Sequence, residues 1–365
     1  MRKILLGLLV VVVVFSAWVS FKSVAPLWSV PDRPTSLDRV GVVVRSIEVK
    51  RRSVLTGLGL GSVTDLHPRG FGGDGCPLIV GENAALWTES EGCVQRRVDF
   101  PSRATHVDAV QWAGDAGPEF LSRGQWCCEP FLLDGSGQVL WSFERGDREA
   151  VNDTVIIRGA SSERDLVLTF NGGGGVLRIA ADGREHWHQE DGNVWHAATL
   201  DVDGDGLEEI VHSNACGSLV VREADGAVRS SARPEGYFSK FELLRFGGAP
   251  VALHVDDGRI LLVGMDGSTQ RAFDAPLAFS LGEPRGTFVE VGKQRWLVTL
   301  ISGSHFDRSA LSVHDATGRL VYAEVLQGGC DAISEAGPST VWFGCPDRVV
   351  ELSLGTAPIA AVRAN

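Results

Sequence analysis

The chain has 365 residues, 44% of them hydrophobic, and a formal net charge of −12 at pH 7. This acidic balance excludes a nucleic-acid partner, because binding to a phosphate backbone relies on clustered Lys and Arg. With 44 Gly, 10 Trp and 16 Phe but only 2 Met, the composition favours many short strands over helices.

The first feature along the chain is an uncharged apolar segment, residues 4–21, which follows Arg2 and Lys3 and ends before Lys22. It predicts a hydrophobic N-terminal helix within residues 1–24, either a cleaved signal peptide or an uncleaved membrane anchor. No small-x-small cleavage pattern is evident, which favours an anchor with its basic end in the cytoplasm. We therefore expect an extracytoplasmic body, periplasmic or at the cell surface. It is either anchored in the membrane by residues 4–21 or secreted after cleavage.

Three further regions follow. Residues 25–38 form a linker, since they contain Pro26, Pro31 and Pro34. Residues 39–355 carry a weak internal repeat and are expected to fold as one domain, and residues 356–365 form a tail.

Seven cysteines fit an exported chain, because disulfides persist outside the cytoplasm. Two pairs are spaced like links between neighbouring strands: Cys76 with Cys93, and Cys330 with Cys345. The adjacent Cys127 and Cys128 either form a vicinal disulfide or pair elsewhere. Cys216 is left over, and we expect it to be buried as a small apolar residue.

The repeat is most visible as an Asp-Gly-like turn followed by an apolar or aromatic strand. Steps of 48, 43, 41 and 49 residues separate its instances. A period in the forties with several short strands per unit is typical of β-propeller blades, and Asp-Gly turns suit the hairpin between the outer strands of a blade. The instances begin at Asp134, Asp182, Asp225, Asp266 and Asp315.

The length of the repeat region predicts an all-β propeller of seven blades, with six or eight as alternatives. The last unit, from Cys330 to Leu354, looks one strand short. We expect the stretch Val40–Val49 to supply the missing strand and close the ring, which also removes exposed sheet edges.

Residues 201–209 read Asp-Val-Asp-Gly-Asp-Gly-Leu-Glu-Glu. Alternating carboxylates on a turn bent by Gly206 can direct several oxygens to one centre, as a Ca²⁺ ion requires. An EF-hand is excluded, because its twelfth loop position would be His212 rather than a carboxylate. The flanking runs 195–200 and 210–213 are short and rich in β-branched or aromatic residues, so a strand is expected on each side.

A second stretch resembles this loop ninety residues earlier. Asp115 matches Asp205 and Glu119 matches Glu209, whereas Gln111 replaces the first aspartate. We interpret it as a former cation loop that kept its turn and lost its ligands. Residues 164–169 offer a fainter third instance.

The run Leu200–Val211 resembles the calcium loop of FG-GAP or VCBS-type repeats, the blades of integrin-α-like β-propellers. The resemblance is specific over about twelve residues. It implies a Ca²⁺ site with four side-chain ligands and one backbone ligand. The side-chain ligands are Asp201, Asp203, Asp205 and Glu209, and the backbone ligand is Leu207.

Two other segments are similar to the tryptophan-docking repeats of quinoprotein-like propellers: Ser136–Trp141 and Thr317–Tyr322. Some quinone-dependent alcohol dehydrogenases of that group carry a vicinal disulfide beside the cofactor, so Cys127 and Cys128 bear on this alternative. No matching set of cofactor ligands is found in the sequence.

Other catalytic signatures are missing from the sequence, which contains neither a Gly-x-Ser-x-Gly motif nor a His-Glu-x-x-His motif. Several histidines lie near the acidic loop in sequence. A transition-metal site is one interpretation, but ordinary strand histidines explain them better. Three tryptophans offer stacking surfaces for sugars, although packing in the blade cores explains them equally well. The histidines are His186, His188, His196 and His212, and the tryptophans are Trp112, Trp126 and Trp195.

Together these features predict an exported, non-enzymatic, calcium-binding β-propeller that holds a protein or glycan partner on one face, with membrane contact through its N-terminal segment. The alternatives are a quinoprotein-like oxidoreductase and a polysaccharide lyase or hydrolase. A lyase or hydrolase would bring a basic residue and carboxylates together in a groove on one face.

Overall fold

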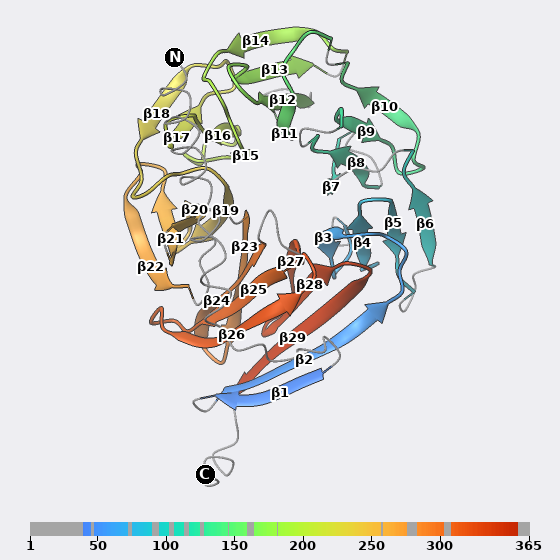
Figure 1. The fold of residues 1–365 in the computed structure, drawn as a ribbon, viewed down its shortest axis with the longest axis vertical. Coiled ribbons are helices and arrows are strands. Elements are labelled where there is room, and N and C mark those ends of the chain that lie inside the picture. Colours follow the sequence, from blue (N-terminus) through green and yellow to red (C-terminus); the bar gives the residue numbers. More distant parts are fainter. Residues whose placement is uncertain are drawn as a thin grey trace, which may run out of the picture.

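The computed structural model describes residues 39–44, 47–71, 75–89, 95–101, 106–112, 117–124, 128–144, 146–158, 164–180, 182–256, 258–275, 283–302 and 308–356. Within these ranges, 29 strands form seven antiparallel sheets arranged around a central axis (Figure 1). The protein is therefore an all-β propeller with seven blades, as the repeat predicted.

Six blades consist of four consecutive strands that run from the axis outwards (Figure 1). Blade 1 comprises β3 (Val63–His67), β4 (Leu78–Gly81), β5 (Ala84–Trp87) and β6 (Arg96–Asp99). Blade 2 comprises β7 (Val107–Val110), β8 (Glu119–Ser122), β9 (Phe131–Leu133) and β10 (Val139–Ser142). Blade 3 comprises β11 (Val151–Arg158), β12 (Arg164–Phe170), β13 (Val176–Ala180) and β14 (Glu185–Gln189).

The next three blades repeat this order. Blade 4 comprises β15 (Ala197–Leu200), β16 (Glu209–Ser213), β17 (Leu219–Arg222) and β18 (Val228–Ala232). Blade 5 comprises β19 (Phe241–Phe246), β20 (Ala249–Asp256), β21 (Arg259–Gly264) and β22 (Thr269–Asp274). Blade 6 comprises β23 (Glu283–Val291), β24 (Gln294–Ser302), β25 (Arg308–His314) and β26 (Leu320–Gln327).

Blade 7 joins the two ends of the described chain. Its inner strands are β27 (Ala332–Gly337), β28 (Thr340–Cys345) and β29 (Arg348–Thr356), and the next strand outwards is β2 (Ile47–Thr56). A fifth strand, β1 (Arg39–Val44), pairs with the outer edge of β2. N-terminal residues thus close the ring as predicted, but the closing strand lies seven residues further along the chain than the predicted one. The closing strand is β2 rather than Val40–Val49, because the backbone pairing with β29 runs along Ile47–Thr56, whereas β1 pairs only with β2.

A buried ion pair connects the closing strand to the neighbouring blade. Arg51 of β2 lies 3.0 Å from Glu324 of β26, and both side chains are almost completely shielded from water. The hydroxyl of Tyr322 donates to the same carboxylate at 2.6 Å. Closure of the ring therefore fixes blade 7 against blade 6 as well as completing its own sheet.

The Asp-Gly-like turns join the third and fourth strands of blades 2 to 6, as predicted. In each, the aspartate Oδ1 accepts a hydrogen bond from the backbone N–H two residues later, for example from Ser136 to Asp134 at 2.8 Å. This local bond replaces a strand partner for the turn residues. The same bond forms at Asp182, Asp225, Asp266 and Asp315.

These turns also contact the preceding blade. Gly226 has φ +91°, and a Cβ atom there would approach the ring of Trp187 of blade 3 to 2.9 Å. The indole N–H of Trp187 donates to the carbonyl of Ala224 in the same turn at 3.0 Å. A glycine is thus required both by the backbone conformation and by the docked tryptophan.

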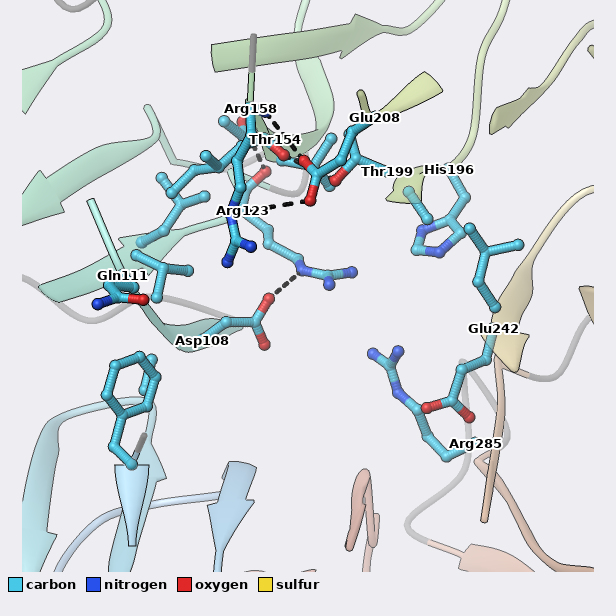
Figure 2. A pocket seen from close by; sticks show the side chains of 18 residues that line it. Asp108, Gln111, Arg123, Thr154, Arg158, His196, Thr199, Glu208, Glu242 and Arg285 are labelled. Carbon is cyan, nitrogen blue, oxygen red and sulfur yellow. Dashed lines mark hydrogen bonds and ion pairs between the residues drawn. The ribbon is translucent and has the colours of Figure 1, made fainter. Parts of the chain in front are cut away.

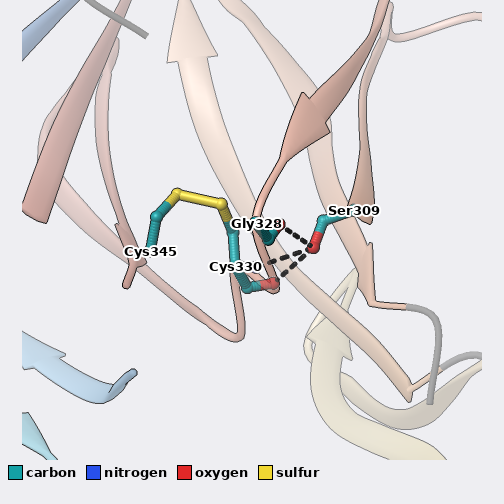
Figure 3. The surroundings of a disulfide bond; sticks show 4 residues. All are labelled: Ser309, Gly328, Cys330 and Cys345. Carbon is teal, nitrogen blue, oxygen red and sulfur yellow. Dashed lines mark hydrogen bonds between the residues drawn. A yellow bond between two sulfur atoms is a disulfide. The ribbon is translucent and has the colours of Figure 1, made fainter. Parts of the chain in front are cut away.

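Cys330 and Cys345 form a disulfide between the start of blade 7 and the end of β28, as predicted (Figure 3). The hydroxyl of Ser309 accepts a hydrogen bond from the backbone N–H of Cys330 at 2.7 Å. Cys76 is disulfide-bonded, but its predicted partner Cys93 lies outside the described residues. So does Cys127 of the predicted vicinal pair.

The expectation for Cys216 was wrong, because this residue is an exposed free thiol rather than a buried one. It lies in the turn between β16 and β17, where its backbone N–H donates to Asn214 Oδ1 at 3.0 Å. The turn needs the backbone group and leaves the side chain in solvent.

The predicted N-terminal helix (residues 4–21), the linker (25–38) and most of the tail (356–365) lie outside the described residues. Within the described ranges, no helix has the length and apolar character needed to cross a bilayer.

Candidate functional site

The acidic loop connects β15 to β16, so the predicted strand on each side is confirmed. In an antiparallel blade, the loop after the first strand and the turn after the third strand emerge on the same face. We call this face of the disc the acidic-loop face, and the other one the opposite face. The loop therefore shares its face with the Asp-Gly-like turns.

Three of the four predicted side-chain ligands converge in this loop. One carboxylate oxygen each from Asp201, Asp203 and Glu209 lies within 4.8 Å of the others. Asp205 is not part of that group. Instead, Asp205 Oδ1 accepts a hydrogen bond from the backbone N–H of Leu207 at 2.7 Å.

Backbone hydrogen bonds hold the loop in shape. Asp201 Oδ1 accepts from the N–H of Gly204 at 2.6 Å, and its Oδ2 accepts from Gly206 at 3.1 Å. Both glycines have positive φ, +84° and +91°, which explains why this turn uses glycine twice. The loop is therefore organised by the same carboxylates that are predicted to bind the cation.

Two of these carboxylates experience opposite electrostatic environments. Burial raises the pKa of Glu209, whose side chain closes the loop from the first position of β16. A hydrogen bond from Arg229 lowers the pKa of Asp203. The guanidinium of Arg229, from β18, lies 2.7 Å from Asp203 and 3.6 Å from Glu209.

This donor set fits a hard divalent cation. Carboxylate oxygens on a glycine-containing loop are the ligands that Ca²⁺ prefers. Arg229 already balances part of their charge, since it pairs with Asp203 and lies near Glu209. Of the predicted ligands, Asp201, Asp203 and Glu209 already lie close enough together to hold such an ion.

The equivalent loop of blade 2 keeps the glutamate hydrogen bond of the acidic loop but lacks its first two aspartates. Glu119 begins β8 and its Oε2 accepts from the backbone N–H of Trp112 at 2.8 Å. In blade 4, Glu209 Oε2 accepts from Val202 at 2.7 Å, across the same interval of seven residues. The interpretation of blade 2 as a loop that retained its turn agrees with this shared bond.

The histidines named from the sequence serve separate contacts. His186 lies 3.2 Å from Asp165, and His196 Nδ1 lies 2.6 Å from Asp153. Burial lowers the pKa of His212 to about 4. Within the described residues, the carboxylates 201, 203 and 209 are the only group of potential metal ligands that comes together.

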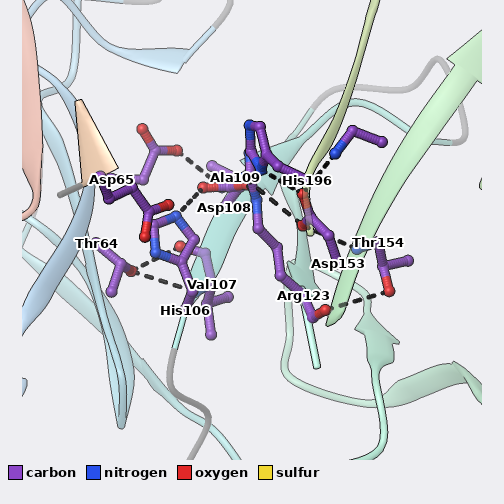
Figure 4. A network of polar contacts seen from close by, with 12 residues as sticks. Thr64, Asp65, His106, Val107, Asp108, Ala109, Arg123, Asp153, Thr154 and His196 are labelled. Atoms are coloured by element: carbon purple, nitrogen blue, oxygen red, sulfur yellow. Dashed lines mark hydrogen bonds and ion pairs between the residues drawn. The ribbon is translucent and has the colours of Figure 1, made fainter. Parts of the chain in front are cut away.

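A belt of charged side chains lies along the inner strands of the propeller, and sequence reasoning did not identify it. Figure 4 shows the part of it that blades 1 to 4 contribute. Arg123 Nε lies 2.5 Å from Asp108, and its Nη1 lies 3.7 Å from Asp153. His106 faces Asp108 at 3.1 Å, much as His196 faces Asp153. Burial opposes ionisation of Asp108, but Arg123 and His106 outweigh it and hold its pKa below the usual range.

Blades 5 and 6 complete the belt. Lys240 lies 2.9 Å from Glu283, and Arg285 lies 3.1 Å from the same carboxylate. Burial opposes ionisation of Glu283, but these two cations outweigh it and keep the pKa of Glu283 well below its ordinary value. Glu242 behaves differently, because burial raises its pKa to about 7.

Some of these acids also connect neighbouring blades. Asp65 Oδ2 accepts from the backbone N–H of Ala109, Asp153 Oδ2 from Ala197, and Glu242 Oε2 from Gly286. The interval is 44 residues in every case. The 44-residue repeat could therefore have identified these acidic residues in the sequence, although each blade contributes only one or two of them.

Two cavities lie on either side of this belt. The larger one, of ≈ 530 Å³, lies at the carboxyl ends of the inner strands, toward the acidic-loop face. Figure 2 shows the guanidinium groups of Arg123, Arg158 and Arg285 directed into it. Glu208 of the acidic loop lines it too, and Glu208 accepts from the backbone N–H of Arg158 at 2.9 Å.

The smaller cavity, of ≈ 190 Å³, lies at the start of the inner strands, toward the opposite face. We call it the entry pocket. It places Trp195, one of the tryptophans noted in the sequence, beside charged residues of the belt. Its lining consists of Arg123, Asn152, Asp153, Trp195, His196, Lys240 and Glu283.

The other tryptophans lie elsewhere. Trp112 is half-buried after β7, on the acidic-loop face, and packs against the core between blades 2 and 3. Trp126 lies outside the described residues. Because Cys127 does as well, the quinoprotein-like alternative stays an untested prediction.

No family model and no curated protein matches the chain. Solved structures do match. BBS1N, crystallised in complex with ARL6DN, is 13% identical with a TM-score of 0.53, covering 86% of this chain and 99% of that one. A streptogramin B lyase is 10% identical with a TM-score of 0.54, covering 84% and 98%. The computationally designed Ika8 protein is 15% identical with a TM-score of 0.50, covering 82% and 98%.

These neighbours include β-propellers, so the comparisons support the fold. At such low identity they show the fold alone, because one scaffold hosts many unrelated functions. The resemblance to FG-GAP or VCBS repeats still rests on the sequence of the acidic loop.

Proposed function

We propose that the protein is an exported, calcium-binding β-propeller that holds a protein or glycan partner on its acidic-loop face. In this proposal Ca²⁺ binds the side chains of Asp201, Asp203, Asp205 and Glu209 and the backbone carbonyl of Leu207. The ion stiffens the loop and does no chemistry. The N-terminal segment either tethers the protein to a membrane or is removed after export.

The observation that carries this proposal is that the acidic loop both contains the carboxylate cluster and lines the larger cavity. Asp201, Asp203 and Glu209 converge within 4.8 Å, and Glu208 of the same loop holds Arg158 at the cavity. A cation bound to the cluster would fix the position of Glu208, and with it the rim on which a partner docks.

The comparisons are consistent with this role. BBS1N was crystallised with another protein, ARL6DN, so a propeller of this general shape serves protein binding. The partner of the present chain is a separate question, since only the fold is shared.

The test is a titration with calcium, followed by capture of partners. Saturating Ca²⁺ at one hundred times its Kd should stabilise the native state by about 2.7 kcal/mol, so a chelator should lower the Tm. Asp203→Ala should abolish the chelator effect, whereas Asp182→Ala, in an outer turn of blade 3, should leave it intact. Pull-down from a membrane and envelope extract should recover a partner with calcium and lose it with chelator. Identical melting curves with and without chelator would contradict the proposal.

A lyase or hydrolase is the second candidate, because the larger cavity brings carboxylates and basic residues together on one face. Glu242, with a pKa of about 7, lies beside Arg285, so it suits proton transfer near neutral pH. If the protein is such an enzyme, it should cleave a soluble polysaccharide, and Glu242→Gln should reduce kcat by about 10²-fold or more. Turnover that survives this substitution would exclude Glu242 as the acid or base.

A further inference from the structure

The entry pocket is built from the first residues of four successive inner strands. Asn152 and Asp153 belong to β11, Trp195 precedes β15, Lys240 precedes β19, and Glu283 begins β23. It lies on the opposite face from the calcium loop. The pocket is therefore a separate site, although both belong to one ring.

One wall of the entry pocket carries a buried acceptor with no partner. Asn152 is 6% exposed, and its Nδ2 donates to Asn193 Oδ1 and to the carbonyl of Val194, both at 2.9 Å. Its Oδ1 accepts no hydrogen bond from the described residues. The Val194 carbonyl fixes this orientation, since a flipped amide would oppose two oxygens.

An unsatisfied buried acceptor is unfavourable by about 1–3 kcal/mol. Such groups are rare in folded proteins and ask for an explanation. Because Asn152 Oδ1 has almost no accessible surface, it marks an unsatisfied group beside the pocket rather than a ligand contact.

The charges around the pocket balance one another. Lys240 is paired with Glu283 at 2.9 Å, and Arg123 lies 3.7 Å from Asp153. Lys240 keeps its positive charge, because the neighbouring carboxylate of Glu283 raises the pKa of Lys240. With two cations and two anions, the lining favours a neutral ligand that has many donors and acceptors over a strongly charged one.

The remaining wall is aromatic. Trp195 is half-buried at the pocket, and an indole combines a large apolar surface with a polar edge. A pyranose ring has the complementary character, with an apolar C–H face and a rim of hydroxyls. The volume of ≈ 190 Å³ is below the range of roughly 300–1,000 Å³ typical of drug-sized ligands, so one sugar ring is the natural occupant.

We propose that the entry pocket binds a neutral pyranose, the terminal residue of a glycan. Trp195 stacks on the ring, while Lys240 and Glu283 bind its hydroxyls. This names a ligand class for the binding role proposed above and rests on it in that respect, but it assigns the glycan to the opposite face and requires no calcium.

The experiment is saturation-transfer NMR and Trp fluorescence with the chain from residue 39 onwards. The probes are glucose, galactose, mannose and N-acetylglucosamine, with their β1,4-linked disaccharides. At least one sugar should bind, equally well with calcium and with chelator. Trp195→Ala should weaken that affinity at least about tenfold, Trp195→Phe should recover part of it, and Lys240→Gln should also reduce it. Trp112→Ala, on the acidic-loop face, is the matched control and should bind like the parent.

Any of three results would overturn the inference: no probe binds the folded protein, Trp195→Ala binds normally with an unchanged Tm, or Trp112→Ala alone loses binding. Calcium separates the two proposals. Loss of calcium-dependent partner capture with sugar binding intact refutes only the proposed function of the acidic-loop face. The reverse pattern refutes only the entry pocket.

Discussion

Glu209 and Glu119 occupy equivalent positions in blades 4 and 2, and each closes its loop by accepting a backbone N–H seven residues earlier. Their neighbours differ, since Gln111 stands where blade 4 has Asp201. The glutamate therefore stabilises its loop through this hydrogen bond whether or not a cation is bound. In blade 4 the same carboxylate has been recruited into the acidic cluster.

The charged belt was invisible in the sequence, for a physical reason. Each inner strand contributes one or two polar residues, and several of their partners lie in other blades, such as Asp153 for Arg123 and Glu283 for Lys240. No local motif results. By contrast, Asp201, Asp203 and Glu209 are close in sequence because one turn brings them together, so a local pattern was sufficient.

Glu242 should make stability depend on pH in a definite window. Its pKa is raised from 4.5 to about 7 by burial, so between these values the native state keeps a proton that the unfolded chain has lost. The stabilisation is full below pH 4.5 and is lost as the pH rises to about 7. Glu242→Gln removes this dependence while its amide oxygen still accepts from Gly286.

The measurement is the Tm of parent and variant from pH 4 to 8. The Tm of Glu242→Gln relative to the parent should increase from pH 4.5 to 7 and then level off. Glu290→Gln, an exposed position of β23, should show no such trend. A difference that stays flat across the range would refute the assignment.

The outer hairpin is the element that the sequence predicted best. An aspartate at the first turn position satisfies its own backbone, and a glycine follows where φ is positive, so the pattern is local and repeats in five blades. What it did not reveal is the contact between blades. Trp187 docks on Gly226, 39 residues ahead, and only the folded ring brings them together.

A disulfide should stabilise the hairpin of β27 and β28. Cys330 and Cys345 are fully buried and enclose a loop with a separation of 15 residues, for which loop-closure entropy predicts about 3 kcal/mol of stabilisation. Replacing both with alanine should lower the free energy of unfolding by about 2–4 kcal/mol in urea denaturation. Cys216→Ser, at an exposed thiol, should change it little. Equal stability of the two variants would show that packing, not the covalent link, holds this hairpin.

At the scale of the whole molecule, the number of blades and the closure by N-terminal residues could be predicted, because the repeat length and the incomplete last unit are properties of the entire chain. The identity of the closing strand could not. Residues 40–49 are richer in β-branched residues than the true partner of β29, and β1 and β2 both have strand-forming composition. Only the pairing with β29 distinguishes them.

Two deletions test this closure. Removing residues 39–56 should expose the edge of β29 and leave Glu324 buried without Arg51, so the protein should aggregate or melt without cooperativity. Removing residues 39–46 takes away β1 alone and should leave a monomer with a cooperative transition. Size-exclusion chromatography and circular dichroism distinguish the outcomes. If the longer deletion remains monomeric and folds cooperatively, β2 is dispensable.

Because β2 is made before every blade but pairs with β29, it leaves the ribosome long before its partner exists. Arg51 lies opposite Leu352, so about 300 further residues must be added to the nascent chain before the two can meet. Folding during synthesis can therefore build single blades but cannot seal the ring. Any interruption of translation before β29 yields a product with two unprotected edges, which a chaperone or protease can recognise.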